Sequence, residues 1–468
     1  MEAFFGIRRL VAELTIFLPC RYDRPILIKE EGSMDSLSVF PRRRLMKLLL
    51  AGPVLTAAAW DRLKAEAEQS ITALSQKYIE DESPDGAYWE ELRNFYAFEN
   101  RFIMMNNGTC GPMPKPVFHA LMQAFQTQMS NPYDVYNYQP TFTEAVRRKL
   151  AAFLHAEPEE VALVSNTTEG INLIVNGLDM KEGDEVLVTS LEHPGHINPW
   201  RLKEKRSGIK IRQVEMPLFP KTTDEIVGAF AAAITPQTQM ISISHTVFIT
   251  GLIMPVKELS RLAHDRGLLL LADSAHGIGM LDLDMKQAGA DFFMSSPYKW
   301  LGAPTGVGVL YVRKEVLEKV WPTIVSSGWD SKKTAAKLDP QGQRADALLF
   351  ALDEALNFNN RIGRRRIEKR IKVLSGYLKR ELQKIPGVKL HTPLDATLSA
   401  GLNAFSVEGV DAARIVDYLR EKHNLVVRTT GNREAGTYGV RVSTPIYTSF
   451  QEADLIVAGV RHLASRKT

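Results

Sequence analysis

Short apolar runs alternate with stretches of helical spacing through the central part of the chain. Seven mainly apolar runs predict β-strands, at residues 161–164, 185–189, 211–214, 240–243, 268–272, 291–294 and 306–312. Helical spacing fills most of the intervals between them, as in 169–178 and 256–266, and precedes them in 117–129 and 141–154. Apolar strands joined by helices predict a mainly parallel sheet that is covered on both faces. The ligand of such a sheet binds beyond the carboxyl ends of the strands.

The pattern changes after residue 330. We expect a long charged helix at 361–382, then strands at 401–406, 425–428 and 440–443 and helices at 412–421 and 451–464. This mixture predicts a smaller α+β domain, while residues 60–82, ahead of the sheet, have the pattern of a polar helix. The expected segments are an extension at 1–59, a helix and gate segment at 60–110, a large domain at 111–330 and a small domain at 331–468.

Composition narrows the class of protein. The 468 residues exceed what one compact core normally holds, and 45% apolar and 24% charged residues are ordinary for a globular protein. The net charge is +4, but the first 59 residues carry nine Lys/Arg against six Asp/Glu, so the rest is nearly neutral. No basic stripe indicates a nucleic-acid partner. Cys20 and Cys110 are too few for a disulfide framework or a zinc site, so we expect no metal.

The N-terminal segment is similar to an export signal. Residues 41–47, Pro-Arg-Arg-Arg-Leu-Met-Lys, match the twin-arginine consensus, and an apolar stretch at 48–59 ends in Thr-Ala-Ala-Ala. This predicts the twin-arginine export machinery as a partner and a periplasmic location. The alternative is a basic amphipathic helix on the body of a cytoplasmic protein. Either Met1 or Met34 could be the start, and outside this segment nothing resembles a membrane span.

An acid and a lysine form the most informative pair. Asp273 ends the apolar run 268–272, and Lys299 follows 26 residues later in Ser-Ser-Pro-Tyr-Lys-Trp. Taken singly, such an acid is often a helix cap and such a lysine is usually a surface residue. Together they suit pyridoxal 5'-phosphate (PLP) chemistry. The lysine amine forms a Schiff base with the cofactor aldehyde, and the carboxylate holds the pyridine nitrogen protonated.

Two further segments follow predicted strands. Residues 165–170, Ser-Asn-Thr-Thr-Glu-Gly, open a helix, and free N–H groups and hydroxyls at that place could bind a phosphate or form a simple capping box. His193 and His196 lie in the loop after the next strand. An imidazole there could stack on a flat cofactor or move a proton, and its position favours His193 over His196. The alternative is a structural or solvated loop histidine.

The order of these motifs resembles the class V aminotransferase family of fold-type I PLP enzymes. The family includes cysteine desulfurases and isopenicillin N epimerase-like proteins, and the similarity runs from about residue 107 to residue 462. It implies an α/β large domain with a mainly parallel seven-stranded sheet, a smaller C-terminal α+β domain, bound PLP and a homodimer.

The resemblance also assigns roles to single residues. Lys299 matches the lysine that binds the cofactor, Asp273 the acid at the pyridine nitrogen and His193 the histidine that stacks on the ring. His276 matches a residue near the phenolic oxygen. Arg441 matches the arginine that grips a substrate carboxylate, a task that suits a forked guanidinium. The phosphate ligands match Thr167, Thr168 and Ser296, and Tyr298, where the family often has histidine, could also bond the phosphate.

Departures from the family pattern point away from sulfur chemistry. Desulfurases carry a cysteine in the loop before the arginine, whereas residues 429–438 contain none and Cys110 lies far away in the sequence. The segment 244–251 lacks an asparagine that is common in desulfurases, and it is closer to the epimerase-like branch. In the family, a threonine at the position of Gln343 contacts the phosphate bound by the partner subunit. This chain has glutamine there, so whether the contact forms is left open.

The resemblance implies an enzyme that acts on the amino group of an amino acid or peptide-like substrate. With an export signal, it resembles the periplasmic enzymes that modify the glutamyl side chain of pyoverdine siderophores, which favours amine modification or transamination. The alternative is an isopenicillin N epimerase-like amino acid or peptide epimerase. Two further alternative functions are that of a lyase and that of a PLP-binding protein without turnover.

Overall fold

A computed structural model describes residues 69–78, 86–98, 101–326, 329–330, 333–339 and 342–466. The chain divides into two units, residues 1–55 and 56–468, and every element named below belongs to the second. The predicted export segment at 41–59 and both candidate starts lie outside the described residues. Of the polar helix predicted at 60–82, residues 69–77 are described and are helical. None of the described helices has the length and hydrophobicity needed to cross a membrane.

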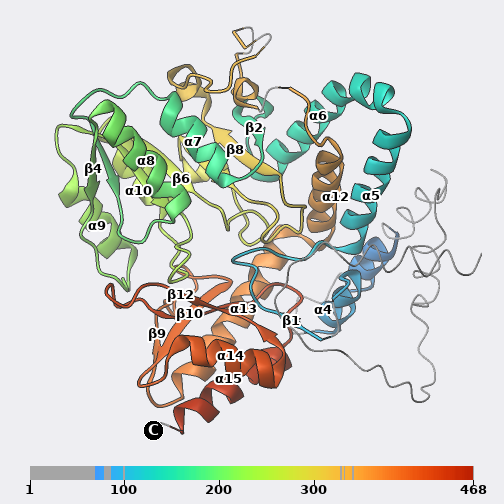
Figure 1. The fold of residues 1–468 in the computed structure, drawn as a ribbon, viewed down its shortest axis with the longest axis vertical. Helices are drawn as coiled ribbons and strands as arrows, with labels where there is room; N and C mark the ends of the chain where they lie inside the picture. The colour runs from blue at the N-terminus through green and yellow to red at the C-terminus, as the bar shows by residue number, and fades with distance from the viewer. Residues whose placement is uncertain are drawn as a thin grey trace, which may run out of the picture. The chain divides into compact units, whose positions relative to one another are not determined.

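A seven-stranded sheet forms the centre of the large domain (Figure 1). In spatial order its strands are β2 (Val161–Val164), β8 (Gly308–Val312), β7 (Phe292–Ser295), β6 (Leu269–Asp273), β5 (Thr238–Ser244), β3 (Glu185–Val188) and β4 (Lys210–Gln213). Strand β8 runs antiparallel to both of its neighbours, and every other neighbouring pair is parallel. The mainly parallel seven-stranded sheet predicted from the sequence is therefore confirmed.

Helices cover both faces of this sheet because successive strand residues point to opposite sides. In β6, Leu270 and Ala272 join one core, whereas Leu271 joins the other. The first core is completed by α5 (Lys115–Ser130), α6 (Pro132–Leu154), α9 (Thr223–Ala233), α10 (Val256–His264), α11 (Met285–Ala288) and α12 (Ala347–Ile362). The second core is completed by α7 (Thr167–Gly177) and α8 (Pro194–Ser207), with Trp200 fully buried.

The small domain packs helices on a four-stranded antiparallel sheet. Its strand order is β12 (Arg428–Thr430), β13 (Gly439–Ser443), β10 (Leu402–Val407) and β9 (Val388–Leu390). The helices are α13 (Arg364–Gln383), α14 (Ala412–His423) and α15 (Phe450–Ala464), and a short parallel pair joins β1 (Ile103–Met104) to β11 (Leu425–Val426). Phe405, Ile415 and Val440 are fully buried in its core. The predicted α+β character is confirmed.

The segment before the sheet packs between the two domains. It contains α4 (Ala87–Leu92) and a 3-10 turn at Arg93–Phe95, and its buried Tyr88 and Trp89 share a core with Trp300 and Tyr447. Tyr447 donates a hydrogen bond through its hydroxyl to Asn107 Oδ1. The chain therefore enters the large domain beside the segment that carries Lys299.

One predicted helix is wrong in its extent. The charged stretch 361–382 was expected to be continuous, but α12 ends at Ile362 and α13 begins at Arg364. Gly363 lies between them with φ at +95°, a backbone conformation that residues with a Cβ rarely adopt. The charge pattern concealed this break because both helices carry basic residues at the junction.

Candidate active site

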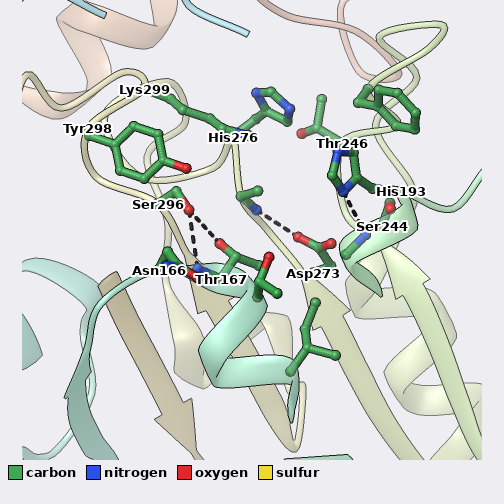
Figure 2. A pocket seen from close by; sticks show the side chains of 15 residues that line it. Asn166, Thr167, His193, Ser244, Thr246, Asp273, His276, Ser296, Tyr298 and Lys299 are labelled. Carbon is green, nitrogen blue, oxygen red and sulfur yellow. Dashed lines mark hydrogen bonds between the residues drawn. The ribbon is translucent and has the colours of Figure 1, made fainter. Parts of the chain in front are cut away.

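The predicted cofactor residues meet in one pocket at the carboxyl edge of the large sheet. Figure 2 shows side chains that converge there from the ends of β5, β6 and β7 and from the start of α7. Parallel strands present their carboxyl ends at the same edge, so segments distant in sequence come together. Eight of the nine predicted residues line the pocket: Thr167, Thr168, His193, Asp273, His276, Ser296, Tyr298 and Lys299. The ninth, Arg441, donates a hydrogen bond to the carbonyl of the pocket residue Phe248 (3.1 Å).

One end of the pocket suits a phosphate. Asn166 caps α7 by accepting the Glu169 amide through its side chain (3.0 Å). The Thr167 amide donates to Ser296 Oγ (3.2 Å), and the two hydroxyl oxygens of Thr167 and Ser296 lie 2.8 Å apart. A Cβ on Gly195 would lie 2.8 Å from Thr168 Oγ1, so glycine keeps that hydroxyl clear. A helix N-terminus surrounded by hydroxyls favours an anion.

Asp273 lies at the opposite side of the pocket and is 5% exposed. Its Oδ1 accepts the Ala275 amide (3.0 Å), as Figure 2 shows. Burial alone would raise the pKa of this carboxyl. The hydrogen bond and charge of His196, with the Ala275 amide and Lys299, outweigh that effect and lower the pKa below its ordinary value. Asp273 is therefore a carboxylate at neutral pH, as a partner of a protonated pyridine nitrogen must be.

His196 does not line the pocket but lies next to Asp273, which does. The sequence analysis favoured His193 over His196 as the functional histidine. It is fully buried, and its Nδ1 lies 3.4 Å from Asp273 Oδ2 and 3.4 Å from Glu192 Oε2. Its Nε2 lies 2.7 Å from Ser242 Oγ, which also accepts the Trp200 indole N–H (2.9 Å). The signal available in the sequence was the i, i+4 spacing of Glu192 and His196 at the start of a helix.

Glu192 is itself held by donors on two sides. Its Oε1 accepts the Thr189 hydroxyl (2.7 Å), and its Oε2 accepts the Ser244 hydroxyl (2.6 Å) and amide (2.8 Å). Two buried carboxylates therefore share one imidazole. Burial would lower the pKa of His196, but Glu192 and Asp273 outweigh burial and raise it above the ordinary value. An imidazolium offsets one of the two negative charges, and the other remains for a cationic group of a ligand.

His193 and His276, the two histidines that line the pocket, are neutral and each accepts a hydrogen bond at Nδ1. Trp300 donates its indole N–H to His276 Nδ1 (3.2 Å), and the Gly195 amide donates to His193 Nδ1 (3.0 Å). A ring nitrogen that accepts a hydrogen bond carries no proton, so each neutral ring carries its proton on Nε2. Burial lowers the pKa of both rings, and for His276 the nearby Lys299 and Arg441 lower it further. Both can donate from Nε2 at neutral pH without adding charge.

Lys299 is held by a loop that precedes the large domain. Asn107 donates its side-chain amide to the Lys299 carbonyl (2.9 Å), and the Gly111 amide donates to the Tyr298 carbonyl (2.9 Å). Burial lowers the pKa of Lys299 to about 8, with Asp273 opposing the shift and Arg441 adding to it. An amine with this pKa can hold or release a proton near neutral pH. In Figure 2 the hydroxyl of Tyr298 points toward the side of Ser296 and Thr167.

Cys110 is distant in sequence from the loop that carries the desulfurase cysteine, but in space it belongs to the segment that contacts Lys299. Its neighbour Gly111 binds the Tyr298 carbonyl, and Thr109 on its other side accepts a hydrogen bond from Arg441 (3.2 Å). The thiol is free and exposed. A thiol is therefore present beside the site.

Arg441 is buried without a counterion in the part of the chain that the structure describes. Its side chain is 2% exposed, and its donors reach Phe248 O, Asn106 Oδ1 and Thr109 Oγ1, all of which are neutral. Its Nε has no partner among the described residues. Burial and the nearby Arg428 lower the pKa of Arg441 to about 9. A buried guanidinium in neutral surroundings favours an anionic ligand such as a carboxylate.

Comparison with known proteins places this site in a class and then in a family. The fold is that of PLP-dependent enzymes, and its pocket holds a lysine, an aspartate and a hydroxyl-lined helix start. The family model for aminotransferase class-V matches residues 103–456, so the chain belongs to the class V aminotransferase family. The family resemblance and the cofactor predicted from the sequence are confirmed, and the cofactor is pyridoxal 5'-phosphate.

Relatives in this family have more than one activity. Isopenicillin N epimerase of Streptomyces clavuligerus is 30% identical over 385 residues, covering 79% of this chain and 96% of that protein. The epimerase of Amycolatopsis lactamdurans is 28% identical over 395 residues, covering 80% and 98%. A probable cysteine desulfurase of Methanothermobacter thermautotrophicus is 28% identical over 357 residues, covering 73% and 86%.

Solved structures show the same fold. A cysteine desulfurase of Thermococcus onnurineus NA1 superposes with a TM-score of 0.71 at 24% identity, covering 80% of this chain and 98% of that one. A variant of the protein C-DES with glycine linked covalently to its PLP cofactor gives a TM-score of 0.70 at 24% identity, covering 76% and 96%.

The residues of this chain fit the cofactor. The hydroxyls and the helix start at Thr167 suit its phosphate, Asp273 suits its pyridine nitrogen, and Lys299 suits its aldehyde. These individual roles, and those of the other pocket residues, stay predictions. Gln343 is exposed, and whether it contacts a partner subunit's phosphate stays open.

We expect His196→Asn to shift the pH dependence of the bound cofactor's absorbance and to destabilise the protein by about 3–5 kcal/mol, as is typical when one member of a buried charge group is removed. The pKa of His196 is raised on folding, so its stabilisation is complete below its ordinary value of 6.5 and is lost as pH rises through the folded value. The loss of melting temperature should therefore become smaller as pH rises above 6.5.

His264→Asn is the matched control for this prediction, because His264 also contacts a buried aspartate, Asp291 (3.0 Å), outside the pocket. It should leave the cofactor spectrum unchanged. Equal spectral shifts in the two variants would show that His196 has no particular link to the site.

Proposed function

We propose that this protein moves the proton on the α-carbon of an amino acid or peptide-like substrate, and that its main outcome is epimerisation. The observation that carries the proposal is the buried, uncompensated Arg441 guanidinium, joined through Phe248 to the pocket of Lys299. It would bind a substrate carboxylate, and its charge already helps to lower the pKa of Lys299. The 30% identity to an isopenicillin N epimerase along 96% of that protein supports epimerisation over other outcomes.

The chain supplies the charges and proton carriers that this chemistry requires. Bound PLP supplies an electron-accepting ring that stabilises negative charge on the carbon next to the substrate amine. Arg441 would orient the substrate through its carboxylate, and Lys299, with a pKa of about 8, would take the proton from one face of the α-carbon. Epimerisation then requires that a proton return to the opposite face. Asp273 would keep its negative charge beside the ring, and His276 would donate from Nε2. Burial of these groups in the pocket keeps their interactions strong.

The test is product analysis with holo-protein in deuterated water. Candidate amino acids and dipeptides of both configurations are incubated, and products are identified by mass spectrometry and chiral chromatography. Deuterium at the α-carbon with inverted configuration and no keto acid supports epimerisation. Stoichiometric keto acid from an amino donor would overturn it in favour of amino transfer.

Amino transfer or another amine modification outside the cytoplasm, of the kind that acts on siderophores, is the second candidate. The twin-arginine-like residues 41–47 favour it, since they indicate export of a folded, cofactor-loaded protein. Fractionation of cells that produce the full chain, compared with an Arg42→Lys, Arg43→Lys variant, tests the location. We also propose a homodimer, which sedimentation of the holo-protein tests.

We further propose that the protein is not a standard cysteine desulfurase. The support is the loop 429–438, which contains no cysteine, while Cys110 occupies a different segment of the site. Incubation with L-cysteine should release no stoichiometric alanine. If alanine and a protein persulfide form and both disappear in Cys110→Ala, this part of the proposal is wrong.

A further inference from the structure

Two arginines lie opposite each other on neighbouring strands of the small domain's sheet. Arg428 on β12 pairs directly with Arg441 on β13 in the antiparallel register. Like charges at directly opposed positions of a sheet repel. The arrangement is therefore unfavourable unless something negative accompanies it.

Both guanidinium groups reach the same neutral oxygen. Thr109 Oγ1 accepts a hydrogen bond from Arg428 Nη1 (3.3 Å) and another from Arg441 Nη2 (3.2 Å). The two donor nitrogens are thus no more than about 6.5 Å apart. Because the groups are close, the charge of Arg428 helps to lower the pKa of Arg441 and of Lys299.

No carboxylate of the described chain compensates this pair of charges, since neither arginine forms an ion pair there. Six other arginines of the described chain do pair with acids: Arg93 with Glu452, Arg147 with Asp339, Arg313 with Asp291, Arg361 with Glu354, Arg364 with Asp282 and Arg433 with Asp411. The last of these, Arg433, lies only five residues from Arg428 in the same loop region. The chain thus leaves two neighbouring cations for a ligand to neutralise.

We propose that Arg428 and Arg441 form a two-cation site, and that the substrate carries two carboxylates, one for each arginine. The buried Arg441 would take the carboxylate next to the reacting carbon, and the exposed Arg428 would take a second carboxylate farther along the substrate. Acidic amino acids and peptides that present such a residue are the substrate class. This inference rests on the proposed function, because it assumes that the substrate's reacting end lies at Arg441.

Binding of unreactive acids tests the site independently of turnover. Glutarate and pentanoate have five carbons each and no amine, so neither can react with the cofactor, and they differ in one carboxylate. With holo-protein in a calorimeter, glutarate should bind at least tenfold more tightly than pentanoate. Arg428→Gln should remove that advantage and leave pentanoate binding unchanged. Arg433→Gln, in the same region but paired with Asp411, should change neither.

Two results would overturn the proposal. Glutarate could bind the unaltered protein no better than pentanoate, or Arg428→Gln could weaken both acids equally, which would mean that the two arginines share one carboxylate. The melting temperature and cofactor absorbance of each variant confirm that it is folded and loaded. Because neither acid is turned over, failure of the epimerase proposal would leave this outcome intact, and the two failures are distinguishable.

Discussion

Lys299→Ala is expected to lower turnover by about 10³-fold or more and to remove the visible absorbance of the lysine-bound cofactor. The side chain supplies both the attachment point and the proton carrier, and the donors that hold its backbone, Asn107 and Gly111, cannot replace an amine. Activity is measured with whichever substrate the product analysis identifies, and cofactor content by absorbance and mass spectrometry. Lys286→Ala is the control, since Lys286 is a surface lysine paired with Glu157.

If Lys299→Ala keeps normal turnover, the assignment of Lys299 is wrong.

The lowered pKa of Lys299 can be tested by a measurement that needs no substrate. In cofactor-free protein, burial lowers the pKa of Lys299 to about 8, and only the neutral amine is acylated. The acetylation rate at Lys299 should therefore rise with pH and level off just above 8. The pKa of Lys286 is raised above its ordinary value by Glu157, so its rate should still be rising at pH 10.

The sheet explains why much of the site could be predicted from the sequence. An apolar run that ends in a polar residue marks the carboxyl end of a buried strand, and both Asp273 and Ser296 follow such runs. Strands β6 and β7 are neighbours and parallel, so these two positions meet at one edge. The fold class, the pocket edge and the lysine–aspartate pair follow from local patterns of this kind.

Contacts between distant segments could not be predicted in the same way. His196 occupies a helix start, and only packing against β5 and β6 places it between two carboxylates. Cys110 is separated from Lys299 by most of the large domain in sequence, yet its loop supports that lysine. Arg428 has an ordinary strand pattern, and its significance depends on the register with Arg441. Side-chain periodicity carries no information on any of these three-dimensional contacts.

The distribution of charged side chains around the pocket relates His196 to the two arginines. Asp273, which lines the pocket, and Glu192 behind it share one buried imidazole, whereas neither Arg428 nor Arg441 forms an ion pair with an acid of the described chain. A ligand with a phosphate, a protonated ring and carboxylates would complement both groups of charges. Among the described residues, His196 offsets one of the two negative charges, whereas no acid forms an ion pair with either arginine.

Asp273→Asn should lower turnover by about 10²- to 10³-fold, the range for losing one preorganised electrostatic partner. Asparagine has the same shape and can still accept the Ala275 amide, so the change removes mainly the negative charge. The bound cofactor's ring nitrogen should then lose its proton at lower pH, which a pH titration of the absorbance measures. Cofactor content should remain, because the Thr167 end and Lys299 are untouched.

Glu192→Gln tests whether Asp273 acts directly on the cofactor or serves only as a counterion of His196. Glu192 Oε2 lies at the same 3.4 Å from His196 Nδ1 as Asp273 Oδ2 does, but Glu192 does not line the pocket. If Asp273 serves only as a counterion of His196, both variants should lose similar activity and stability and show the same spectrum. If it acts on the cofactor, only Asp273→Asn should shift the spectral titration, while Glu192→Gln affects mainly the melting temperature. Equal spectral shifts would reject the direct role, because the imidazole would then transmit the whole effect.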